Sequence, residues 1–314
     1  MRSVLVSLLL LSAACGLRRP GDPYRVTVDV GPWMHQLATD DELDRVEARG
    51  RLEALGEAGF PALRAGLHRE PPSARVGICE ALWRVGGPEA VPILIEAAHD
   101  TNPDVRQQAL LGLGHIGDLR GRPTVEAGLD DPSSPVRLAA ALSCRAPDLC
   151  VSPAALARLV DIAIHDDIPT SLWAHAALVH IMGRGGEPAK IVQADIERTA
   201  VPAVATGSLD ERARAAILAS DIGNAAGAKV LNEAAIKASN PQLRQQAIYA
   251  LGRVGDASAV PVLAGLLRQP DTETSNYSYQ ALTSASARGI PEAQHALEAY
   301  HGPRPTQPVS RPVP

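Results

Sequence analysis

One stretch of sixteen residues, present twice in this chain, constrains the fold more than any other feature of the sequence. The segment PDVRQQALLGLGHIGD (residues 103–118) recurs as PQLRQQAIYALGRVGD (residues 241–256), with nine identical positions and three conservative exchanges. Copying at this fidelity is typical of repeat proteins, in which each copy is one structural unit. The chain is therefore best analysed as an array of such units.

Each copy predicts a helix with defined ends. Asn102 and Asn240 directly precede the prolines, as suits an N-cap followed by proline in the first turn. Val105 and Leu113 fall on one helical face, and Gly117 suits a left-handed C-cap. A second amphipathic segment follows, so the unit is a helical hairpin of about 30 residues. Such a hairpin cannot bury both of its faces alone and must stack on neighbours.

Divergent copies of the unit extend from residue 40 to residue 301. Hydrophobic residues make up 46% of the chain but aromatic residues only 3%, so the core must consist of Ala, Leu and Val, which suits closely spaced helices. We predict an all-α fold, a right-handed superhelical α-solenoid of about eight hairpins over residues 40–301. The net charge of −5, with no basic run, argues against a nucleic-acid partner.

The N-terminus predicts export. Residues 1–14 contain a short apolar run followed by small residues, which is typical of a secretory signal peptide and too short for a membrane span. Cys15 directly follows Ser12-Ala13-Ala14, with Leu11 one position earlier. This resembles the bacterial lipoprotein signal, in which the cysteine receives lipid such as palmitate. The resemblance implies a membrane anchor at Cys15; the alternative is an ordinary signal peptide with a cysteine near the cut by chance.

Two segments lie outside the predicted solenoid. Residues 15–39 are predicted to be a linker behind the anchor, within which residues 24–30 alternate in the manner of an extended segment. Residues 302–314 contain five prolines and are predicted to be a disordered or polyproline-like tail.

The repeated units resemble HEAT repeats, in particular the bacterial HEAT-like type first named from phycobilin lyases. The matching motifs are V-R-x-x-A, L-G-x-I/V-G-D and A-V-P-x-L, as in Val105-Arg106, Ile116-Gly117-Asp118 and Ala259-Val260-Pro261. The resemblance implies a ladder of Arg–Asp pairs between adjacent repeats. Its candidate members here are Arg75, Arg106, Arg137, Arg214, Arg244, Asp100 and Asp131. The alternative is that these arginines line a groove for an acidic partner.

Few residues suggest chemistry. Cys144 and Cys150 are close in sequence and are predicted to form a disulfide in an exported protein, whereas Cys79 is predicted to be buried and inert. The sequence around His165, with His175 and His180 further on, is the best metal candidate, but its spacing favours loop chemistry over a metal site. No phosphate loop, nucleophile elbow or zinc-protease motif is present.

These observations lead to a functional expectation. We expect a non-catalytic protein-binding or scaffold module without a cofactor, anchored by lipid in the cell envelope, facing the periplasm, with the outer membrane favoured over the inner. Solenoids offer long concave surfaces for extended partners. The alternatives are an enzymatic role like that of chromophore lyases, implied only by the family resemblance, and a purely structural envelope spacer.

Overall fold

The computed structural model describes residues 29–39 and 41–303. The predicted signal peptide, Cys15, most of the predicted linker and all but the first two residues of the predicted tail lie outside these ranges. Within them the fold is all-α and contains no strand. None of the described helices is long and apolar enough to cross a membrane.

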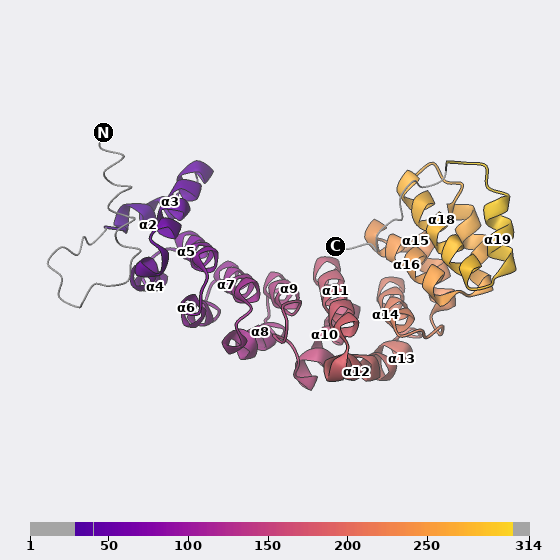
Figure 1. Ribbon diagram of the computed structural model, residues 1–314, viewed down its shortest axis with the longest axis horizontal. Helices are drawn as coiled ribbons and strands as arrows, with labels where there is room; N and C mark the ends of the chain where they lie inside the picture. The colour runs from indigo at the N-terminus through magenta and orange to yellow at the C-terminus, as the bar shows by residue number, and fades with distance from the viewer. Residues whose placement is uncertain (1–28, 40, 304–314) are drawn as a thin grey trace.

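The helices stack as eight successive hairpins that form an arc (Figure 1). The first helices of the hairpins are α3 (Glu42–Ala54), α5 (Pro72–Val85), α7 (Pro103–Ile116), α9 (Ser134–Ser143), α11 (Ile168–Arg184), α14 (Leu209–Asp221), α16 (Pro241–Val254) and α18 (Thr272–Ala287). The second helices are α4 (Phe60–Leu67), α6 (Ala90–Ala97), α8 (Arg122–Gly128), α10 (Pro153–His165), α12 (Gly186–Asp195), α15 (Ala228–Lys237), α17 (Val260–Leu266) and α19 (Pro291–Glu298).

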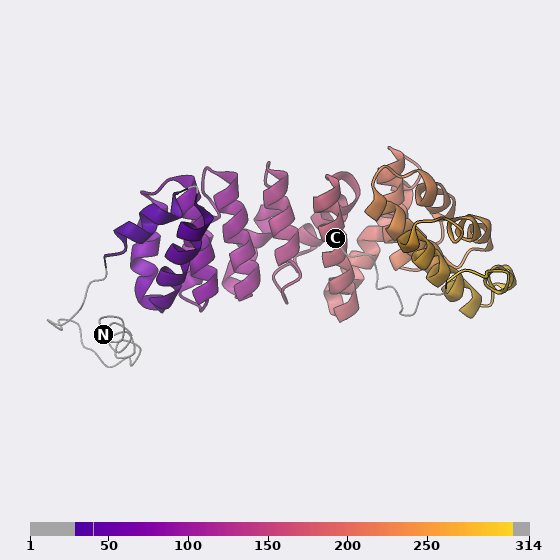
Figure 2. The same cartoon turned by 90° about the horizontal axis from the view of Figure 1, so that it is seen from above.

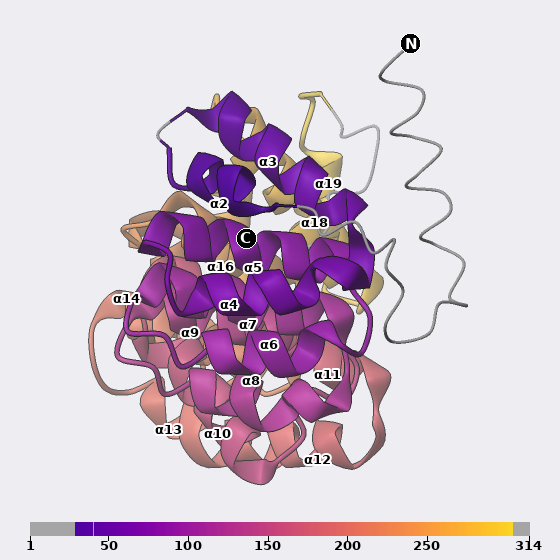
Figure 3. The ribbon, with the colours of Figure 1, turned by 90° about the vertical axis from the view of Figure 1, so that its left-hand side faces the viewer.

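The first helices and the second helices form two layers. From α5 to α11 the first helices lie on the inside of the arc and α6, α8, α10 and α12 on its outside (Figure 1). Seen from above, neighbouring first helices run side by side (Figure 2), and the view along the arc shows the second helices beneath them (Figure 3). The predicted solenoid is confirmed.

The repeated segment forms its helix for the reasons that its sequence indicates. The side chain of Asn102 accepts hydrogen bonds from the backbone N–H groups of Asp104 and Val105, and Gly117 ends the helix with a φ of 70°. Asn240 and Gly255 play the same parts in α16. Both ends of these helices are thus capped by residues that the sequence singles out.

Small residues allow the first helices to approach one another closely. A Cβ added to Gly114 in α7 would lie 2.8 Å from the Cα of Ser143 in α9 and 2.7 Å from its Cβ. The Ser143 hydroxyl uses this proximity to donate a hydrogen bond to the Leu110 carbonyl at 2.8 Å. Glycine at this position therefore sets the spacing of the layer.

The solenoid begins earlier than the predicted boundary at residue 40. A short helix, α2 (Gly31–Leu37), packs on α3 and α5 and buries Met34 and Leu37. Leu37 fills the space above Gly77, where an added Cβ would come within 2.8 Å of it. The last part of the predicted linker is therefore a capping helix, because two apolar residues three positions apart cover the open end of the core.

The fifth hairpin is the irregular one. After α12 the chain continues through a π-helical turn, Ile196–Ala200, and the short α13 (Val201–Ala203) before α14 begins. A π-turn of this kind interrupts regular helical packing. It lies where the arc changes direction (Figure 1).

Candidate functional site

Three arginines of the first helices each pair with an aspartate of the following repeat. Arg106 donates from Nε and Nη2 to the two carboxylate oxygens of Asp131, both at 2.8 Å. Arg75 binds Asp100 with the same two distances. Arg137 binds Asp166 at 2.5 and 2.7 Å. The structure therefore forms a ladder of bidentate pairs across three successive joints of the solenoid.

The third nitrogen of each guanidinium is also occupied. Nη1 of Arg75, Arg106 and Arg137 donates to the carbonyl of Glu70, Asp100 and Asp131, respectively, at 2.8 to 2.9 Å. These arginine side chains are only 15–17% exposed. They consequently offer no free face to an acidic partner, in contrast to the groove alternative.

Two carboxylates of the ladder, Asp100 and Asp131, are held in their ionised form. Burial alone raises the pKa of Asp131, but hydrogen bonds from Arg106 and from the Ser133 N–H outweigh it, so its pKa lies below the usual value. Asp100 has its pKa lowered in the same way, by Arg75 and by the backbone N–H of the next N-cap residue. Each aspartate thus joins two repeats and orders the loop between them.

Arg214 and Arg244 do not form such pairs. Arg244 keeps only the hydrogen bond to the backbone and donates to the Ala238 carbonyl at 2.7 Å. It has no bidentate partner because Gln269 occupies the place of the ladder aspartate in the next repeat. Arg214 is buried, its Nη1 donates to the Asp166 carbonyl at 3.1 Å, and burial lowers its pKa. In the other repeats the ladder arginine lies four residues after the N-cap, and in α14 that residue is Arg212. The prediction that Arg214 belongs to the ladder is therefore wrong.

The structure joins Cys144 and Cys150 in a disulfide, with Cα atoms 5.0 Å apart. The loop that it closes replaces the glycine corner of other repeats and carries Asp148 at a φ of 61°. The backbone carbonyl of Asp148 accepts a hydrogen bond from Arg122 at 2.7 Å, and the Asp148 carboxylate accepts one from Arg184 at 2.9 Å. The loop therefore links α9 to the repeats before and after it.

An aromatic–cationic row follows the first helices from α5 to α11. Its members are Trp83, Arg84, Leu111, His115, Arg145 and Trp173, all exposed or partly exposed. The rings of Trp83 and His115 stack with centroids 4.4 Å apart, and the guanidinium of Arg145 lies 5.6 Å from the ring centroid of Trp173. Arg145 has no carboxylate partner among the described residues. The row combines flat apolar surface with positive charge.

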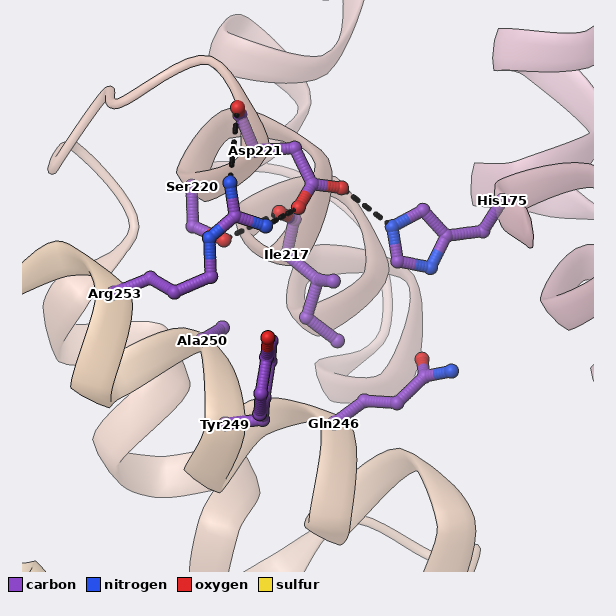
Figure 4. Close-up of a pocket in the computed structure, with 8 residues that line it drawn as sticks. All are labelled: His175, Ile217, Ser220, Asp221, Gln246, Tyr249, Ala250 and Arg253. Carbon is purple, nitrogen blue, oxygen red and sulfur yellow. Dashed lines mark hydrogen bonds and ion pairs between the residues drawn. The ribbon is translucent and has the colours of Figure 1, made fainter. Parts of the chain in front are cut away.

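A buried polar cluster lies where α11, α14 and α16 meet (Figure 4). Asp221 at the end of α14 has a carboxylate oxygen 2.6 Å from Nε2 of His175, and it also forms an ion pair with Arg253. Tyr249 and Gln246 complete the surroundings. The space between these side chains does not admit a water molecule, so the cluster is not a ligand pocket.

No group of three or more His, Cys, Asp or Glu side chains in the described part of the chain is arranged to hold a metal ion. The metal candidate of the sequence is used otherwise. Asp166 binds Arg137, Asp167 caps α11 at the Thr170 N–H, and His165 lies 3.6 Å from Glu211. The thiol of Cys79 is buried, which raises its pKa to about 12 and makes it unreactive.

Comparison with known families agrees with this architecture. A family model described as HEAT repeats matches residues 60–145, 96–179 and 201–298, which together exceed half of the chain. The chain therefore belongs to the HEAT-repeat family. A comparison with curated proteins gives no match.

Several solved structures match this chain at low sequence identity. YibA of Escherichia coli is 16% identical over 82% of this chain and 93% of its own, with a TM-score of 0.57. Human deoxyhypusine hydroxylase is 18% identical over 90% and 99%, with a TM-score of 0.35. The CpcE–CpcF complex of phycocyanin lyase from Nostoc is 16% identical over 90% and 98%, with a TM-score of 0.40. At 16% identity the likeness to YibA concerns the fold alone.

Proposed function

We propose that this protein is a non-catalytic scaffold of the cell envelope that binds a protein partner on the inside of its arc. In this proposal lipid on Cys15 holds it to a membrane, facing the periplasm, with the outer membrane favoured. The observation that carries the proposal is the aromatic–cationic row, whose members come from α5, α7, the loop after α9, and α11. A partner lying along the arc would contact these helices in turn.

The chemistry of the row suits a protein partner with carboxylates. Tryptophan and arginine are enriched at the energetic centres of protein interfaces, because they bury large surfaces and form directional contacts. Arg84 and Arg145 are exposed, whereas the ladder arginines are committed to the interior. An acidic segment would therefore meet the row and not the ladder.

Two observations support an envelope location. The N-terminal sequence has the features of an export signal ending at Cys15. The Cys144–Cys150 disulfide is of a kind that persists in oxidising compartments such as the bacterial periplasm. An anchor would raise the local concentration of the scaffold near a membrane-bound partner.

The test combines anchor and surface. Intact cells producing wild type, Cys15→Ala, Leu111→Asp or Leu119→Asp are crosslinked, fractionated and analysed by mass spectrometry. Leu119 is a matched control, because it is 53% exposed but lies outside the row. We expect wild type in membranes, Cys15→Ala in the soluble periplasmic fraction, and one protein crosslinked to wild type and Leu119→Asp but not to Leu111→Asp.

Two results would contradict the proposal. If Cys15→Ala remains in membranes to the same extent as wild type, the lipid anchor is wrong. If Leu111→Asp and Leu119→Asp retain the same crosslinked proteins, the row is not the binding surface.

A further inference from the structure

α14 is buried in a way that the other first helices are not. All eight residues from Ala213 to Ser220 are buried, so its central turns have no exposed face. A solenoid helix ordinarily exposes one side, as α7 does at Gln107 and Leu111. In α14 that side is covered by side chains that reach over it from α11 and α16 (Figure 4).

Asp221, the last residue of α14, is contacted by one side chain from α11 and one from α16. Its side chain is 2% exposed, and Nε2 of His175 in α11 donates to one carboxylate oxygen at 2.6 Å. The guanidinium of Arg253 in α16 pairs with the other oxygen and also donates to the Asp221 backbone carbonyl at 3.1 Å. One buried carboxylate therefore connects helices that belong to two different parts of the array.

The rest of the α11–α14 joint is polar as well. These two helices do not pack closely against each other, in contrast to every other pair of neighbouring first helices in the described chain. The joint is instead bridged by Arg214, which donates to the Asp166 carbonyl, and by His165 beside Glu211. Nε of Arg214 finds no hydrogen-bond acceptor among the described residues. The π-helical turn lies in the same hairpin connection.

A polar joint separates at lower cost than an apolar one. Opening an apolar joint exposes hydrophobic surface, whereas the partners of a polar joint exchange their hydrogen bonds for bonds to water. The ladder pairs also stop here, since Asp166 is the last rung. The array thus consists of a first arm, α3 to α11, and a second arm, α14 to α19. Polar groups join the two arms between their first helices, and α14 packs on α10 and on the π-helical turn in the other layer.

We infer that this joint is a hinge and that the contact of His175 in the first arm with Asp221 in the second forms a latch that holds the two arms in one orientation. Arg253, which belongs to the same arm as Asp221, holds that carboxylate in place. The latch fixes the curvature of the arc and with it the shape presented to anything bound inside it. Released, the arms change their angle while each arm keeps its internal packing. This inference concerns arm orientation and stands whether or not the proposed partner surface is correct.

Pulsed electron–electron double resonance between nitroxide labels tests the hinge. In soluble Cys15→Ala protein, Ala54→Cys and Ser284→Cys place labels on exposed positions of the two arms, and Ala54→Cys with Ala127→Cys gives a pair within the first arm. With first helices spaced about 9 Å apart and four such spacings between α11 and α3, a change of about 10° at the joint moves α3 by about 6 Å. The latch variant is Asp221→Asn, and the control is Asp118→Asn, which removes a partly exposed carboxylate paired within its own repeat.

We expect Asp221→Asn to shift or broaden the between-arm distance by several ångströms and to leave the within-arm distance unchanged. His175→Leu, which removes the contact across the joint and keeps the Arg253 pair within the second arm, should act in the same direction and covers the case that Asp221→Asn does not fold. Between-arm distances that match wild type in the folded latch variant, or equal broadening of both pairs, would overturn the hinge.

Discussion

Removing one rung of the ladder tests how the repeats are held in register. Arg106→Met keeps most of the apolar stem and removes the guanidinium. Asp131, which is 12% exposed, loses two charge-assisted hydrogen bonds and keeps the one from the Ser133 N–H. The Asp100 and Thr101 carbonyls lose their donor as well.

The expected cost follows from this geometry. Removing one partner of a buried ion pair destabilises a fold by about 3–5 kcal/mol. A hydrogen bond to a charged group contributes about 1.5–3 kcal/mol to stability. Water reaches this pair in part, because Arg106 is 15% exposed. We therefore expect Arg106→Met to lower the free energy of unfolding by about 2–4 kcal/mol.

The assay is urea unfolding of soluble Cys15→Ala protein followed by circular dichroism, with amide hydrogen exchange to locate the change. Exchange is needed because repeat arrays lose parts of their structure separately. Arg64→Met is the matched control: Arg64 is 60% exposed and pairs with Glu96 at 2.9 Å, so its loss should cost less than about 1 kcal/mol. Equal losses from the two substitutions, or faster exchange far from the α7–α9 joint, would refute the reasoning.

The same substitution predicts a pH dependence. The pKa of Asp131 lies below its unfolded value of about 3.9. The rung therefore contributes fully above that unfolded value, and its contribution is lost as the pH falls through the folded pKa. The destabilisation caused by Arg106→Met should consequently shrink between about pH 7 and about pH 3. A difference that stays constant with pH would show that Asp131 does not contribute through its charge.

Two further predictions concern single features of the fold. Cys15→Ala protein contains three cysteines, of which Cys144 and Cys150 are joined. After denaturation it should therefore give one titratable thiol without reduction and three after reduction. Three thiols in both samples would contradict the disulfide. In thermal unfolding, Gly114→Ala should destabilise the fold by about 1–3 kcal/mol, because the added Cβ would meet the α9 backbone. Gly50→Ala, in open space within α3, should instead stabilise it by about 0.5–1 kcal/mol. Equal effects of the two glycine substitutions would show that helix spacing is not set at Gly114.

The regular part of the fold was predictable because its information is local. Caps such as Asn102 and Gly117 lie within the same short segment as the helix that they delimit. The capping helix α2 was missed because only Met34 and Leu37 mark it, and two apolar residues in seven do not make a periodic pattern. What reveals it is the open end of the core that it covers.

The ladder was predictable in its residue types and only partly in its pairing. Asp100 and Asp131 stand out because each precedes an arginine of its own repeat by six residues. The bidentate pair, however, is made with the arginine of the previous repeat, as between Arg75 and Asp100. The spacing does not identify Asp166 as a ladder residue, since the residue six positions after it is Leu172 and not an arginine.

The buried cluster was not predictable from spacing. His175 and Asp221 are 46 residues apart, and the repeat of His175 matches the common motif poorly. A signal was nevertheless present: α14 reads ARAAILAS, a segment too apolar throughout for a helix with one exposed side. That excess of small apolar residues indicated a helix covered on all sides.

The unequal distribution of the rungs imposes an order on how the array is built and lost. All three bidentate pairs join repeats between α5 and α11, and the described residues from α14 to α19 contain none of this type. In a linear array each interface contributes separately, so structure nucleates where interfaces are strongest and frays where they are weakest. The N-terminal arm then serves as the folding template, and the C-terminal hairpins are the first to melt.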